Sequence, residues 1–222
     1  MKALLRPALR YFALFIVLYG ILTAISMTPA VGEFCNRIYR KPTEPILAAL
    51  LPKAYLQIKA EGALYDTLRI EFASKAQVLE QIAIAKKTGQ AMTRIDGMNN
   101  LVNFQNLFTS FFVFLVVLVL LSPVSWQQKV KGIVIGTFIY YLHTVFKLYL
   151  VELIYFNEPN IAIYQTNPNV LSIAKGIRYW MTVSTNALVV LIIWAVVILK
   201  KDNWQALLGR NGKLGLGSNI KS

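Results

Sequence analysis

Titratable side chains that could do chemistry gather in one apolar segment, residues 133–156. This segment contains His143, Lys147 and Glu152, although an ordinary membrane-spanning helix carries no charge. At about 100° per residue, the polar side chains near its middle fall within about 120° of one another on one helix face. We call this set the polar stripe: Thr137, Tyr140, His143, Thr144 and Lys147.

Several kinds of chemistry are open to the polar stripe. As titrating groups, His143 and Lys147 could relay protons or ions. A metal site needs more ligands than a single histidine supplies, and acyl transfer needs a nucleophile beside His143, to which no spacing brings the lone Cys35. We therefore expect no catalytic residues, metal or other cofactor. A packing role is also open, against a partner's helix or against Thr182, Ser184, Thr185 and Asn186 of the next apolar segment.

The charges of this segment lack counter-ions on their own helix face. Lys147 is predicted near the membrane midplane, and its Cβ leans toward the start of the helix, so the ammonium cannot easily reach the far surface. Its counter-charge comes from another chain or from a lipid phosphate, unless Lys147 has no counter-ion at all. Glu152 lies roughly 120–140° away around the helix, so we expect it to pair with Lys175 or Arg178 in the next loop.

The composition places these residues in a membrane protein. Of the 222 residues, 56% are hydrophobic and 15% charged, which is far from the composition of a soluble enzyme. The 23 Lys and Arg exceed the 10 Asp and Glu, but no basic patch on a soluble module and no zinc spacing accompanies this excess. We therefore expect no nucleic acid partner and interpret the charge as a topology signal.

Four apolar segments are long enough to cross a bilayer of about 30 Å at about 1.5 Å per residue. The sequence thus predicts a membrane all-α fold of four transmembrane helices, with a small exported α+β insertion between the first two. Residues 1–31 hold the cytoplasmic N-terminus and the first span (11–31), 32–103 the exported loop, and 104–199 the other spans. These lie at about 104–122, 133–156 and 179–199.

Basic residues give the orientation, because short loops rich in lysine and arginine stay in the cytoplasm. The regions 1–10, 123–131 and 200–222 carry 10 Lys and Arg and 1 acid, whereas 32–103 and 157–178 carry 12 and 8. We expect both termini in the cytoplasm of a bacterial inner membrane, with 32–103 exported. The basic tail, 200–222, could lie on anionic lipids through Lys200, Lys201 and Arg210.

The exported loop is predicted to fold in part. Residues 44–53 form a short apolar run between prolines, typical of an interfacial helix. Residues 55–59 and 68–72 alternate strictly and predict a β-hairpin, which is marginal in water unless it gains a third element. That element could come from 74–89, which fits a helix, or a strand through 81–85. The amides in 97–106 favour capping of the second span.

The order of these features is similar to that of a known family. A first span, the turn ALLPKAYLQIKAEG, the strand LRIEF, the NNLVNFQNLFTSFFVFLVVLVLL entry to a second span and two further spans resemble the small membrane proteins associated with bacterial exosortases, of the exosortase-H-associated type. The resemblance covers nearly the whole chain. It implies an inner-membrane accessory of a protein-sorting system, not the exosortase itself, whose pattern needs a Cys, an Arg and a His on successive spans.

These observations predict a non-catalytic accessory subunit whose partners are other integral membrane proteins in a hetero-oligomer. One alternative is a proton, ion or solute transport subunit that uses His143 and Lys147 along an aqueous path. Another is an enzyme or binder of a lipid-linked anionic substrate, held by the polar stripe and a basic mouth at Lys175 and Arg178.

Overall fold

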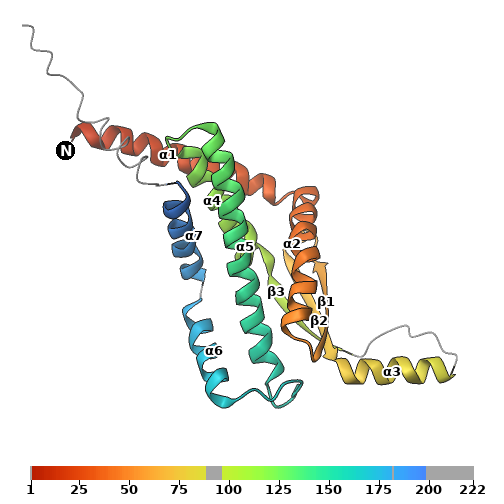
Figure 1. Ribbon diagram of the computed structural model, residues 1–222. Helices are drawn as coiled ribbons and strands as arrows, with labels where there is room; N and C mark the ends of the chain where they lie inside the picture. Colours follow the sequence, from red (N-terminus) through yellow and green to blue (C-terminus); the bar gives the residue numbers. More distant parts are fainter. Residues whose placement is uncertain (1, 89–96, 182, 199–222) are drawn as a thin grey trace, which may run out of the picture.

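The computed structural model describes residues 2–88, 97–181 and 183–198. The protein is mostly helical, with a small three-stranded antiparallel sheet (Figure 1). Two helices are long and apolar enough to cross a membrane by length and composition, which is compatible with the predicted helical membrane protein with a mixed insertion. The predicted basic tail, 200–222 with Lys200, Lys201 and Arg210, lies outside the described residues.

The first two helices meet at a break near the end of the predicted first span. Helix α1 (Lys2–Ser26) contains the candidate span Leu9–Ser26, and α2 (Pro29–Leu50) starts at a proline, which suits a first helical turn because it lacks an N–H. The short interfacial helix expected at 44–53 is therefore wrong in extent. Those residues are mostly the end of a long helix that tolerates Pro42 and Pro45.

The next helices form the packed centre of the molecule. A π-helical turn, η1 (Gln105–Thr109), continues into α4 (Ser110–Leu121), which ends before Pro123 as the sequence predicts. Helix α5 (Trp126–Phe156) begins with a capping box, in which the Ser125 and Gln128 side chains bond to each other's backbone N–H groups. Together, η1 and α4 form an apolar helix shorter than the candidate spans.

The last described elements are two shorter helices. Helix α6 (Pro168–Trp180) follows an N-cap Asn167, whose side chain accepts a hydrogen bond from the backbone N–H of Asn169. Helix α7 (Val183–Ile198) is apolar after Ser184, Thr185 and Asn186 near its start. The segment predicted as a fourth span, 179–199, is not one straight helix: it begins in the last turn of α6, and α6 and α7 are bent by 78° relative to one another.

The hairpin is confirmed, and the sheet gains its third strand from an unexpected place. Strands β1 (Ala54–Glu61) and β2 (Thr67–Ser74) pair antiparallel, and β3 (Met98–Asn103) pairs with β2. Of the alternatives for 74–89, the helix is correct: α3 (Lys75–Thr88) projects from the end of the sheet (Figure 1). Of the amides predicted to cap the second span, Asn99, Asn100 and Asn103 lie in β3. Asn103 also caps as predicted, because its Oδ1 atom accepts from the Asn106 N–H at the start of η1 at 2.8 Å.

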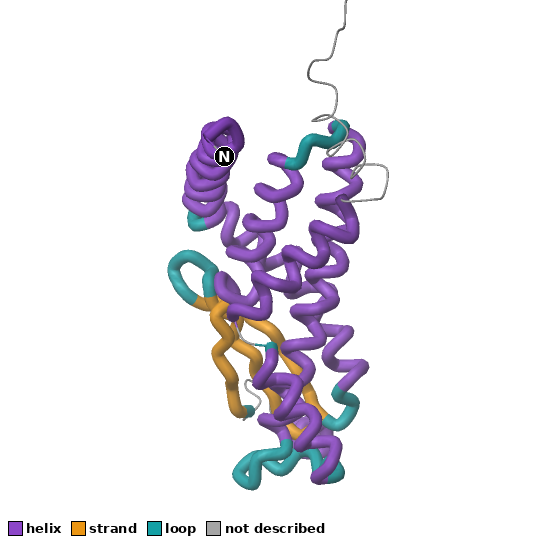
Figure 2. Tube along the Cα trace, turned by 90° about the vertical axis from the view of Figure 1, so that its left-hand side faces the viewer, coloured by secondary structure: helices purple, strands orange, loops and turns teal. Residues whose placement is uncertain are grey.

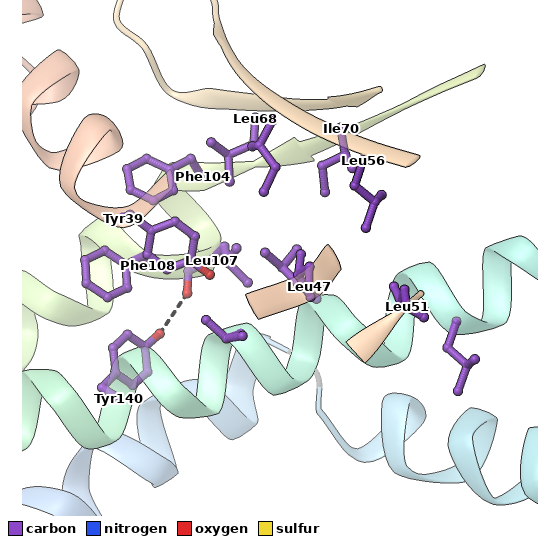
Figure 3. Close-up of a cluster of buried hydrophobic side chains, with 14 of the residues drawn as sticks. Tyr39, Leu47, Leu51, Leu56, Leu68, Ile70, Phe104, Leu107, Phe108 and Tyr140 are labelled. Atoms are coloured by element: carbon purple, nitrogen blue, oxygen red, sulfur yellow. Dashed lines mark hydrogen bonds between the residues drawn. The ribbon is translucent and has the colours of Figure 1, made fainter. Parts of the chain in front are cut away.

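One hydrophobic core joins the sheet to the helices. The inner face of the sheet carries Leu56, Ile70 and Phe72, and Phe72 packs on Phe156 of α5 with ring centroids 4.7 Å apart. Figure 3 shows Leu47 of α2 and Leu51, the residue after the end of α2, in the same cluster. The mixed insertion is therefore not an independent domain, because the second half of α5, which lies outside the insertion, covers part of its buried face.

The first half of α5 packs between α4 and α7 through small residues. A Cβ added at Gly136 would lie 3.0 Å from Leu115 of α4 and 3.4 Å from Ile193 of α7. Helix α1 contacts α4 through Phe15 and Tyr19, whose rings stack on each other and both meet the ring of Phe114 in a T-shaped arrangement. Figures 1 and 2 show that α1 crosses these helices obliquely and does not run along them.

Gly32 is a test of how tightly α2 approaches the hairpin turn. A Cβ at Gly32 would lie 2.5 Å from the backbone oxygen of Leu64, so Gly32→Ala should lower the unfolding free energy by roughly 1–3 kcal/mol. The matched control is Gly20→Ala, which has open space and should be neutral or slightly stabilising. Thermal unfolding in detergent measures both, and equal effects would contradict the close approach.

Candidate functional site

Tyr140 and Thr144 of the polar stripe contact other segments of the same chain. The Tyr140 hydroxyl donates to the Leu107 carbonyl at 2.9 Å (Figure 3). Leu107 lies within the π-helical turn η1. The Thr144 hydroxyl accepts from Tyr39 of α2 at 3.2 Å and donates to the Tyr141 carbonyl. The Oγ1 atom of Thr137 is buried and has no hydrogen-bond partner within the described part of the chain.

Tyr39 fixes α2 to α5 as a hydrogen-bond donor. It is 2% exposed and packs on Phe104 and Phe108, and burial raises the pKa of its hydroxyl well above the ordinary value. The phenol therefore stays protonated and donates to Thr144. A second bond between the same helices joins Tyr141 to Thr43 at 3.2 Å.

His143 and Lys147 converge on one side chain of α7. The Nε2 atom of His143 and the Nζ atom of Lys147 each lie 3.3 Å from Oδ1 of Asn186. Asn186 is fully buried, and its Nδ2 atom has no partner among the described residues. The expected contact of the stripe with Asn186 is thus present, whereas Thr182 and the side chain of Ser184 lie outside what the structure describes. Thr185 donates to the Trp180 carbonyl.

Lys147 has no carboxylate partner in the described part of the chain. The ion pairs there are Arg37–Glu33 on α2, and Lys59–Glu71 and Arg69–Glu61 on the sheet. Lys147 is half-buried and shares one neutral amide oxygen with His143. An ammonium in such a setting keeps its charge at a cost, unless an acceptor from outside the chain completes it.

Lys147 lies near one end of the packing of α7 against α5. Side chains of α7 line α5 from Ile198, near Gly132, to Asn186 beside Lys147. Lys147 therefore lies at the end of the three-helix packing, not at its middle. The reason is that α5 extends beyond this packing, and its remaining turns contact the sheet and α6.

Glu152 faces the sheet, so its predicted ion pair is wrong. Its Oε1 atom accepts from Nδ2 of Asn100 at 2.9 Å, and Oε2 has no partner among the described residues. Lys175 and Arg178 are exposed, because α6 turns Ala174 toward α5. The register Ile58–Ile70–Asn100 places the amide on the inner face. A prediction of 98–103 as a strand would have placed Asn100 and Asn99 on opposite faces of the sheet. Asn100 would then have been a candidate partner for Glu152.

The described residues of the polar stripe make hydrogen bonds and include a charged lysine, but they do not match a known catalytic arrangement. Within the described ranges, no three His, Cys, Asp or Glu side chains lie together as metal ligands. Cys35 lines an apolar pocket of about 180 Å³ with Val113 and Phe112, and burial raises the pKa of its thiol. A protonated thiol in an apolar wall is a poor nucleophile.

Comparison of the chain with protein-family models, curated proteins and solved structures gives no match. The resemblance to exosortase-associated proteins therefore stays a prediction, and the function is argued from the geometry.

The Asn100–Glu152 contact can be measured with a double-mutant cycle. Asn100→Leu should lower the unfolding free energy by roughly 1–3 kcal/mol, because it leaves a buried carboxyl without its partner. Glu152→Leu is the other single variant of the cycle, and Glu152→Gln, which keeps an acceptor, should cost less than Asn100→Leu. In Asn100→Leu/Glu152→Leu, part of the loss should return, as read by thermal unfolding in detergent. Strict additivity of the single changes would contradict the contact.

Proposed function

We propose that the protein is a non-catalytic accessory subunit of an inner-membrane assembly whose partner is another integral membrane protein. The observation that carries this proposal is Lys147, a half-buried ammonium between packed apolar helices with no carboxylate partner among the described residues. A charge in that position is costly alone, and an acidic side chain from a neighbouring helix would offset the cost. The resemblance to exosortase-associated proteins extends the proposal to a protein-sorting assembly.

The proposed topology has four crossings with both termini in the cytoplasm. Helix α1 continued by the first turns of α2, then η1 with α4, α5 and α7 would each cross once. In support, the first two turns of α5, which follow the short loop after α4, carry Lys129 and Lys131, and the described exposed residues of α1 are largely apolar, as a lipid-facing helix requires. Residues 32–103 would then be exported.

The surface beside Lys147 supports a helical partner. Phe138, Leu142 and Phe146 are exposed and follow the helix at a spacing of four residues, next to the polar side chains of the stripe. A partner helix seated on this apolar ridge would bring a carboxylate within reach of Lys147 without exposing backbone groups. Lipid chains would cover these apolar side chains as well as a partner helix does, so the ridge alone does not select a partner. An ion pair with Lys147 would supply that selectivity.

The test compares variants of tagged protein expressed at its native level and purified in gentle detergent. Lys147→Met should reduce the co-purified partner on the order of tenfold, because removal of a buried ionic partner costs more than about 1.4 kcal/mol. Lys147→Arg should retain the partner. Lys131→Met, at the other end of α5, is the matched control and should behave as wild type.

Unchanged capture by Lys147→Met, with unchanged thermal stability, would contradict the proposed role of Lys147. It would favour a lipid phosphate or solvent as the acceptor of this charge.

A further inference from the structure

The two edges of the sheet are treated differently by the rest of the chain. At the β1 edge, the Ile58 N–H donates to Glu44 Oε2 at 2.9 Å, and the Ile58 carbonyl accepts from Arg40 Nη1 at 3.4 Å. Both outward backbone groups of this residue are therefore bonded by α2, whose side chains block the edge. Such blocking is a common protection against pairing with another strand.

The register shows which backbone groups face outward at the β3 edge. The Phe104 N–H donates to the Asp66 carbonyl, so the pairs Leu68–Val102, Ile70–Asn100 and Phe72–Met98 carry the ladder bonds with β2. The alternate residues then direct their N–H and C=O groups away from the sheet. These residues are Asn99, Leu101 and Asn103.

No other described segment covers those outward groups. Asn99, Leu101 and Asn103 are exposed, with Leu101 at 56%, and among the described residues none of their backbone groups has a partner on that side. Strand β3 also lacks the charged residues, prolines and bulges that usually protect an edge. The edge therefore offers a strand-shaped row of donors and acceptors.

We infer that β3 is a strand-addition site, on which an extended segment of the partner protein pairs as a fourth strand. This inference rests on the proposed function and identifies the kind of partner segment. Its backbone would bond to Asn99, Leu101 and Asn103, and its side chains on the outer face would lie beside two amides and a leucine. An uncharged segment of alternating polar and apolar residues fits these neighbours.

A second copy of this chain does not fit the same edge within one membrane. Antiparallel pairing of two β3 strands in a continuous sheet places the two-fold axis perpendicular to the sheet. Figures 1 and 2 show the sheet standing beside α2 and the second half of α5, with its strands running along these helices. Such an axis would be perpendicular to α5, so the α5 helices of the two copies would run in opposite directions. The two copies would then need opposite orientations in the membrane.

The experiment uses the full chain, tagged and extracted with its partner in gentle detergent. Leu101→Pro removes one outward N–H and adds a ring at the edge, yet leaves the bonds to β2 in place because Leu101 does not donate to that strand. The matched control, Leu101→Ser, changes the side chain and keeps the N–H. We expect the proline variant to lose co-purified partner on the order of tenfold and the serine variant to retain it.

Hydrogen exchange on the wild-type protein gives a second readout that does not depend on the folding of a variant. Amides in 97–104 should exchange more slowly in the complex than in the separated chain, while the exposed turn after β1, near Gly62, should not change. Equal exchange in 97–104, or equal capture by proline and serine variants, would overturn strand addition and leave the accessory function standing.

Two other results would also overturn the inference. Absence of any partner from wild type would overturn both it and the proposed function. A disulfide between two copies of a Cys35→Ser/Leu101→Cys variant at native expression would show that a second copy occupies the edge.

Discussion

The length of α5 is the constraint on which the other elements depend. Its 31 residues give about 46 Å of helix, which exceeds an apolar layer of about 30 Å. The helix therefore has two environments: α4 and α7 surround its first half, and α2, α6 and the sheet cover most of its second half. Each polar contact of the candidate site lies where one of these neighbours meets α5.

Two of these contacts have a buried polar atom that the described chain leaves unpaired. Asn186 accepts from His143 and Lys147, and Asn100 donates to Glu152, so both amides join α5 to a different element. Glu152 is fully buried within this chain, so a group from a partner protein cannot reach its Oε2 atom. Lys147 is half-buried instead, so a group from outside can reach it, and this difference directs the functional proposal to Lys147.

The sequence predicted what depends on local pattern. The hairpin followed from the alternation of 55–59 and 68–72, and the end of the second apolar segment followed from Pro123. The prediction failed where tertiary contacts decided. Half of the residues of β3 are asparagines, which have low strand preference, so its pairing with β2 defines it. The partner of Glu152 depended on that strand, because Asn100 of β3 donates to its carboxylate.

The proposed subunit role requires the claim that this chain works as part of a larger membrane assembly. Native mass spectrometry of the wild-type protein, released from gentle detergent after native-level expression, tests that claim most directly. The account predicts a stoichiometric complex of the 25.0 kDa chain with a second integral membrane protein. A chain released alone, or bound to lipid without a protein partner, would contradict it and would assign the charge of Lys147 to a function within this protein.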